Sequence, residues 1–156
     1  MKPDLLQLTS LLDGRLQALR DLAREIEAGQ QALILLDVQR LQLHDSQKER
    51  ICAHVRRLDR EIAGTLSTLA PQKSLRGLAD EIEASRNEPR AASELMRLLD
   101  ESRAAGVDVA KLNKAYGEFL CRSRRTVKIL TNVVFHCLGL YPPPLTSLRS
   151  VLGRSY

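Results

Sequence analysis

The sequence predicts an all-α fold, an elongated antiparallel helical bundle or coiled-coil hairpin of three long helices and one short helix, followed by a flexible C-terminal tail. Apolar residues recur at alternating spacings of three and four along most of the chain, which is the pattern of helices that are buried on one side. Aromatic residues make up only 3% of the chain, so Leu supplies most of the core. Strand-forming residues are sparse, and no long stretch alternates apolar and polar residues.

The first helix is expected from about Pro3 to Leu36. Pro3 suits the first turn of a helix, where its missing N–H has no intrahelical partner to lose. Apolar residues recur every seven positions from Leu5 to Leu33, with a companion row beside them. Gly29 weakens this helix by about 1 kcal/mol relative to Ala, so any bend is expected there.

A second helix is expected from about Val38 to Leu69, with Asp37 as its N-cap and Pro71 as its terminator. His44 and Lys48 interrupt its apolar seam, so we expect its first half to be poorly buried. No strong helix breaker separates the first two helices. One continuous, kinked rod is therefore an alternative to two separate helices.

A short helix is expected over about residues 75–85, with Ser74 as its cap, and Pro89 is expected to start the last long helix. The last helix carries one unbroken heptad seam that we expect to be buried along one side. The seam consists of Leu95, Leu98, Ser102, Ala105, Val109, Leu112, Tyr116, Phe119, Ser123, Thr126, Leu130 and Val133. Gly106 as a terminator and Asp108 as a new cap would split this helix, but the unbroken phase across Gly106 favours one helix.

We expect a helical domain over residues 1–140 and a Pro-rich flexible tail over residues 141–156. Residues 142–144 are three consecutive prolines, which cannot continue a helix. No apolar stretch is long enough to span a bilayer, and the first residues lack the apolar run of a signal peptide. We therefore expect a cytoplasmic protein with no membrane insertion.

The sequence lacks the signatures of an enzyme or a metal protein. It has no Gly-rich phosphate loop, no GxSxG and no HExxH. The three Cys residues form no CxxC pair, and Cys52 and His54 point about 200° apart on a helix, so they cannot share one ion. We expect no catalytic activity, no cofactor, no metal and free thiols.

Positive charge is concentrated at the C-terminal end. The chain carries a net charge of +5, whereas residues 111–156 alone carry +7. Such a segment suits an acidic partner or nucleic acid. Tyr116 and Phe119 lie on the apolar seam rather than beside the Arg cluster, so bases would lack stacking platforms, and we expect no nucleic-acid partner.

Apolar residues near the end of the last helix are denser than one seam requires, which is typical of a surface that receives a partner helix. The residues that indicate such a surface are Arg122, Arg125, Leu130, Val133, Val134 and Phe135. A groove lined by Leu12, Leu19 and Ile26 is the alternative site. A structural or scaffolding coiled coil and a basic nucleic-acid-associated helical protein are the alternative functions.

Three stretches resemble the FlgN-type flagellar export chaperones. Residues 33–41 resemble that family's apolar-then-Asp junction between its first two helices, and residues 47–51 resemble the charged segment that follows. A third set of residues resembles the late helix of the family: Leu112, Asn113, Leu120, Arg124, Val127 and Leu130. The chain departs from the family at Tyr116, where a second Asn is often found.

The resemblance implies an all-helical cytoplasmic chaperone for flagellar type III export. Its partners would be the hook–filament junction proteins, whose C-terminal helical segment it would bind before export, and also the export apparatus. With the resemblance, the candidate partner-binding residues also include Leu112, Asn113, Tyr116, Phe119, Leu120 and Val127.

Overall fold

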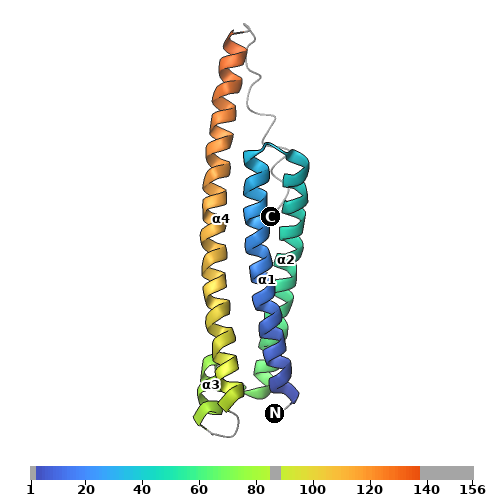
Figure 1. Cartoon of the computed structure of the whole chain (residues 1–156), viewed down its shortest axis with the longest axis vertical. Helices are drawn as coiled ribbons and strands as arrows, with labels where there is room; N and C mark the ends of the chain where they lie inside the picture. Colours follow the sequence, from blue (N-terminus) through green and yellow to red (C-terminus); the bar gives the residue numbers. More distant parts are fainter. Residues whose placement is uncertain (1–2, 85–88, 138–156) are drawn as a thin grey trace. The chain divides into compact units, whose positions relative to one another are not determined.

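The computed structural model describes residues 3–84 and 89–137. Helices contain 94% of these residues and no strand occurs among them, which confirms the all-α prediction. The helices are α1 (Pro3–Ile34), α2 (Val38–Leu69), α3 (Leu75–Ala84) and α4 (Pro89–Cys137) (Figure 1). The predicted tail, residues 141–156, lies outside the described residues.

The first two helices are separated by a left-handed turn rather than joined in one rod. Leu36 has a φ of 56°, and its N–H donates to the carbonyl of Leu33 at 3.1 Å. The N–H of Asp37 reaches back to the carbonyl of Ala32 at 2.9 Å, which completes a Schellman-type helix end. The side chain of Asp37 then accepts a hydrogen bond from the backbone N–H of Arg40 at 3.0 Å, so the predicted N-cap is confirmed.

The next two boundaries also follow from local signals. α2 ends at Leu69, two residues before Pro71, which could not continue the helix. The N–H of the next residue, Ala70, donates to the carbonyl of Leu66 at 2.8 Å. Ser74 caps α3 as predicted, because its Oγ accepts a hydrogen bond from the N–H of Gly77 at 3.1 Å.

α4 runs without a break through Gly106, so the alternative of two helices divided at this glycine is wrong. No side chain approaches within 4 Å of the position that a Cβ atom would occupy at Gly106. The chain divides into two compact units, Met1–Tyr116 and Gly117–Tyr156, and the boundary between them falls within α4. Each unit is described by itself below.

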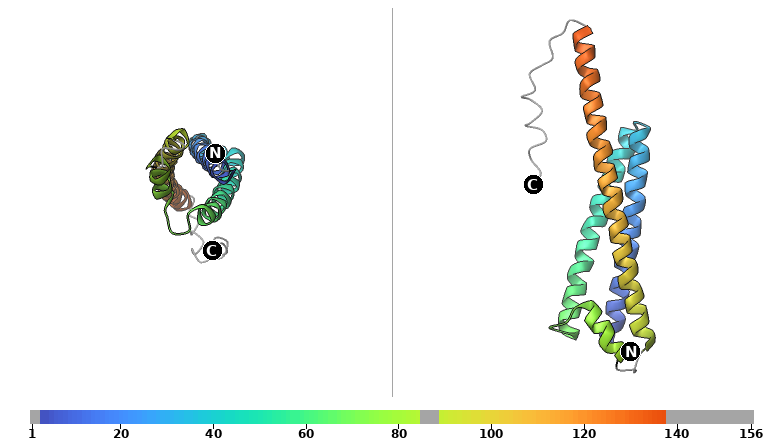
Figure 2. Two further views of the ribbon diagram at one scale, coloured as in Figure 1. Left: turned by 90° about the horizontal axis from the view of Figure 1, so that it is seen from below. Right: turned by 90° about the vertical axis from the view of Figure 1, so that its left-hand side faces the viewer.

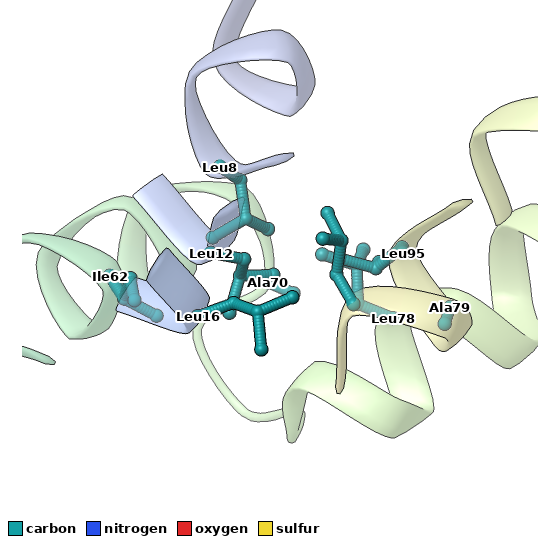
Figure 3. Packing of buried hydrophobic residues seen from close by; sticks show 9 residues of the cluster. Leu8, Leu12, Leu16, Ile62, Ala70, Leu78, Ala79 and Leu95 are labelled. Carbon is teal, nitrogen blue, oxygen red and sulfur yellow. The ribbon is translucent and has the colours of Figure 1, made fainter. Parts of the chain in front are cut away.

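The first core cluster joins all four helices within the unit Met1–Tyr116 (Figure 3). Its buried members are Leu8, Leu12 and Leu16 from α1, Ile62 from α2, Ala70 from the following turn, Leu78 and Ala79 from α3, and Leu95 and Leu98 from α4. Six of the nine lie on the apolar rows that the sequence pattern predicts, whereas Leu16, Ala70 and Ala79 do not. α1 and α2 have the most extensive backbone contact of any helix pair among the described residues.

The second core cluster surrounds Tyr116, again within the unit Met1–Tyr116. Leu22 and Ile26 of α1 pack with Tyr116, and partly buried residues of α2 and α4 complete the cluster. Lys48, the polar interruption of the α2 seam, places its Nζ atom 4.1 Å from the centre of the Tyr116 ring. A cation over an aromatic face is attracted by the ring, so the lysine is accommodated at the edge of the core.

The expectation that the α4 seam is buried along its whole length is wrong for its second half. Its members are buried or half-buried as far as Tyr116, whereas Phe119, Leu130 and Val133 are exposed. The cluster around Tyr116 already includes Leu33 and Leu41, which lie close to the turn between α1 and α2. Neither core cluster of the described residues includes a residue of α4 beyond Tyr116.

Candidate partner-binding surface

The structure separates the predicted partner-binding residues into two groups. Leu112 is half-buried and Tyr116 is 6% exposed, and both belong to the second core cluster. Asn113 is exposed, in the same unit as these two. The remaining predicted residues lie on the part of α4 that follows Gly117, where all are exposed except the half-buried Phe135. They are Phe119, Leu120, Arg122, Arg125, Val127, Leu130, Val133, Val134 and Phe135.

Most exposed apolar residues of this segment fall on one side of α4. With about 100° of rotation per residue, six of them occupy one continuous arc of about 140°. We call these six residues the apolar stripe: Phe119, Leu120, Val127, Leu130, Val133 and Val134. Ser123 and Thr126 are the polar residues within the same arc, and Leu130 lies close to its centre.

Two apolar residues lie off the stripe. Phe135, which the sequence predicted as part of the same surface, points about 130° away from the centre of the stripe. Ile129 is 56% exposed and lies about 110° from the centre on the other side; it was not predicted because it occupies no seam position. The binding surface is therefore narrower than the sequence density suggested, and the exposed Ile129 provides a control position outside it.

Positive charge is concentrated on the same segment of α4, and part of it flanks the apolar stripe. With about 100° of rotation per residue, Arg122 and Arg124 lie within about 40° of the two edges of the stripe, whereas Arg125 and Lys128 lie about 150° from its centre. Between Gly117 and Cys137 the chain carries four Lys or Arg residues and one acid, Glu118. The cations are Arg122, Arg124, Arg125 and Lys128. Within the described part of the chain, none of these four forms an ion pair. Their charge is therefore available to attract an acidic partner.

Most ion pairs of α4 lie instead near its start, although Lys111 also pairs with Asp108 at 3.6 Å. Arg97 donates to Glu94 and to Glu101, with N–O distances of 2.6 Å to each. The hydrogen bond from Arg97 lowers the pKa of Glu94 below its usual value, and the two carboxylates raise the pKa of Arg97. These pairs support the helix locally and leave no free charge for a ligand.

The described residues offer little material for metal chemistry. Within residues 3–84 and 89–137, no group of three or more His, Cys, Asp or Glu side chains is arranged to hold a metal ion. The three cysteines are free; Cys121 and Cys137 are exposed and Cys52 is half-buried. His44 is hydrogen-bonded through Nδ1 to Glu25 at 2.8 Å, and His54 through its Nδ1 to Arg57 at 3.0 Å.

Over the same ranges, no helix combines the length and apolar character needed to cross a membrane. Comparison of the chain with protein-family models, curated proteins and solved structures finds no match. The function is therefore inferred from the residues themselves.

Proposed function

We propose that the protein is a helix-binding chaperone that holds an acidic amphipathic helix against the apolar stripe of α4. The observation that carries this proposal is the exposure of six large apolar side chains in one arc, with Arg122 and Arg124 near its edges and without an ion-pair partner among the described residues. Exposed apolar patches rimmed by polar residues mark protein-interaction sites. An amphipathic helix would cover the arc with residues at its own spacings of three and four.

Apolar burial is expected to supply most of the affinity. Each Å² of apolar surface removed from water contributes about 25 cal/mol before the cost of association is subtracted. Each exposed ion pair contributes only about 0–1 kcal/mol. The cations of this segment, such as Arg122 and Arg125, are therefore expected to act mainly on the association rate.

The resemblance to FlgN-type chaperones supports a particular client. We propose that the bound helix is the C-terminal segment of a flagellar hook–filament junction protein, kept unpolymerised in the cytoplasm until it is passed to the type III export apparatus. The acidic character that α4 requires of its partner can be checked directly in the sequences of such clients.

We also propose that the supporting scaffold is an antiparallel bundle. Two contacts between α1 and α2 support this arrangement: Arg15 pairs with Asp59 at 2.6 Å, and Glu25 with His44 at 2.8 Å. Glu25 follows Arg15 along α1, whereas its partner His44 precedes Asp59 along α2, and this reversed order is that of antiparallel helices. The two core clusters use residues of α4 only as far as Tyr116, and the six stripe residues belong to neither cluster.

The decisive experiment compares two neighbouring, equally exposed positions. Leu130 is 58% exposed near the centre of the stripe, and Ile129 is 56% exposed outside it. Leu130→Asp should weaken binding of junction-protein C-terminal peptides by at least about tenfold, because it places a charge in the centre of the interface. Ile129→Asp should change the affinity by less than about threefold, which is the effect of a rim residue. Titration calorimetry measures both, and circular dichroism verifies that each variant stays helical.

Equal losses in the two variants would contradict a stripe-specific site. If neither variant affects peptide binding, the client does not use α4 beyond Gly117. The pair Arg122→Ala and Arg125→Ala tests the electrostatic part separately: the association rate should fall at low salt, and the difference from wild type should shrink as salt is added. A second copy of this chain is a poorer occupant, because it would bring four further cations to the same surface.

A further inference from the structure

A groove with a volume of about 530 Å³ lies within the unit Met1–Tyr116, apart from the apolar stripe. Its apolar lining includes Leu12 of α1, Ile62 and Leu66 of α2, Leu75 of α3 and Leu99 of α4. The views in Figure 2 show α1 between α2 and the first part of α4, which is consistent with this lining. Its volume falls within the range of roughly 300–1,000 Å³ that is typical of ligand sites.

The groove contains one polar group without a partner. The Ser102 side chain lines the groove and the residue is 3% exposed, yet its Oγ atom forms no hydrogen bond with any described residue. A buried hydroxyl that lacks a hydrogen bond costs about 1–3 kcal/mol, so such a group calls for an explanation. A ligand that offers a hydrogen-bonding group to Ser102 would remove this cost.

The charges at the groove favour an acidic ligand. Arg15 and Asp59, both lining it, are paired with each other at 2.6 Å. Arg103, also in the lining, is exposed and forms neither an ion pair nor a side-chain hydrogen bond with any residue that the structure describes. The groove therefore presents one uncompensated positive charge next to apolar walls and the Ser102 hydroxyl.

We infer that this groove is a second docking site, which receives the apolar face of an acidic amphipathic helix from another protein. Leu or similar side chains of that helix would contact Leu12, Ile62 and Leu99, and a carboxylate would pair with the exposed Arg103. The Ser102 hydroxyl is buried in the free protein, so a polar group of the ligand would reach it only after the side chains that cover it shift. The groove is lined by all four helices, and an added helix would bury its apolar walls. The inference does not rest on the apolar stripe, because the two sites share no residue.

Two glycines provide a matched test. Gly106 lines the groove and Gly64 does not, and at both positions a Cβ atom would meet nothing within 4 Å. Both lie within long helices, where replacement of Gly by Phe removes the same helix-weakening residue. Gly106→Phe should fill the groove, whereas Gly64→Phe adds the same bulk elsewhere. Both variants are made in the full chain that carries Leu130→Asp, so that the stripe does not contribute.

The probe is a synthetic blocked peptide of about 18 residues, with Leu at helical spacings and Glu on the flanking positions. In the Leu130→Asp chain we expect Gly106→Phe to weaken its binding by at least about tenfold and Gly64→Phe by less than about twofold. Ser102→Ala should weaken binding without lowering the thermal midpoint, because it deletes a hydroxyl that is unpaired in the free protein. The same peptide with Lys in place of Glu should bind more weakly.

Three outcomes would overturn the inference. Equal affinities of the two glycine variants would show that the peptide binds elsewhere, and undiminished binding of the Lys peptide would show that the charge at Arg103 is irrelevant. A change in sedimenting mass between Gly106→Phe and Gly64→Phe without peptide would show that a second copy of the chain fills the groove. The separate comparison of Leu130→Asp with Ile129→Asp tests the stripe, so failure at one site is distinguishable from failure at the other.

Discussion

Replacement of Tyr116 by Ala should destabilise the unit Met1–Tyr116 strongly. The Tyr116 ring is 6% exposed, packs with Leu22 and Ile26, and lies 4.1 Å from the Nζ atom of Lys48. Truncation of a buried aromatic side chain to Ala typically costs about 3–5 kcal/mol, because contacts are lost and a cavity remains. Loss of the Lys48 contact adds about 0.5–2 kcal/mol. We expect the free energy of unfolding to fall by about 4 kcal/mol, a large share of the roughly 5–15 kcal/mol of a typical domain.

Tyr116→Phe is the matched control. It keeps the ring and its position under Lys48, so the free energy of unfolding should change by less than about 1 kcal/mol. Urea denaturation followed by circular dichroism measures both variants, and the Ala variant should also melt about 10 °C lower. If Tyr116→Ala is as stable as wild type but binds partner peptides more weakly, Tyr116 belongs to a binding surface and the core assignment is refuted.

Three further outcomes are expected. Leu36→Gly should raise the free energy of unfolding by up to about 1 kcal/mol, because Gly tolerates the left-handed φ of 56° and Leu does not; a loss of stability measured by urea denaturation would contradict this. The pKa of Glu94 lies below its ordinary value, so the interaction of Glu94 with Arg97 stabilises the fold at pH values above the ordinary pKa, and this contribution is lost as the pH falls through the lowered pKa. Arg97→Ala should flatten this part of the profile of stability against pH, and an unchanged profile would argue against the pair. Cys121 should react with a thiol reagent faster than the half-buried Cys52, and equal rates would contradict the described burial.

Local signals in the sequence were sufficient for most helix boundaries. Asp37 and Ser74 cap the helices that they were expected to cap, because a short polar side chain can satisfy a free N–H of the first turn wherever the helix lies. The end of the first helix was placed two residues late, at Leu36, because Leu is an unusual residue at a left-handed position. Its backbone conformation depends on hydrogen bonds to residues that precede it, which no residue preference revealed.

The candidate site shows where sequence reasoning failed. The heptad phase places Tyr116 and Leu130 on the same seam, yet the former is in the core and the latter is 58% exposed. A heptad repeat shows which residues share a face of a helix, but it does not show how far along the helix that face is buried. Phe135 was assigned to the stripe because of its position near apolar neighbours in the chain, although its angle around the helix separates it from them.

The all-helical class and the heptad rows could be predicted from the sequence, and the heptad phase favoured one helix through Gly106 over two, because periodicity and capping act over only a few residues. The extent of the buried part of the α4 seam required the folded structure, since burial depends on which seam residues join a core cluster, and the last to do so is Tyr116. It also revealed the groove with the unpaired Ser102 hydroxyl, because that groove is formed by side chains from four helices that are distant in the chain. Both candidate binding sites therefore depend on long-range packing that a local repeat does not encode.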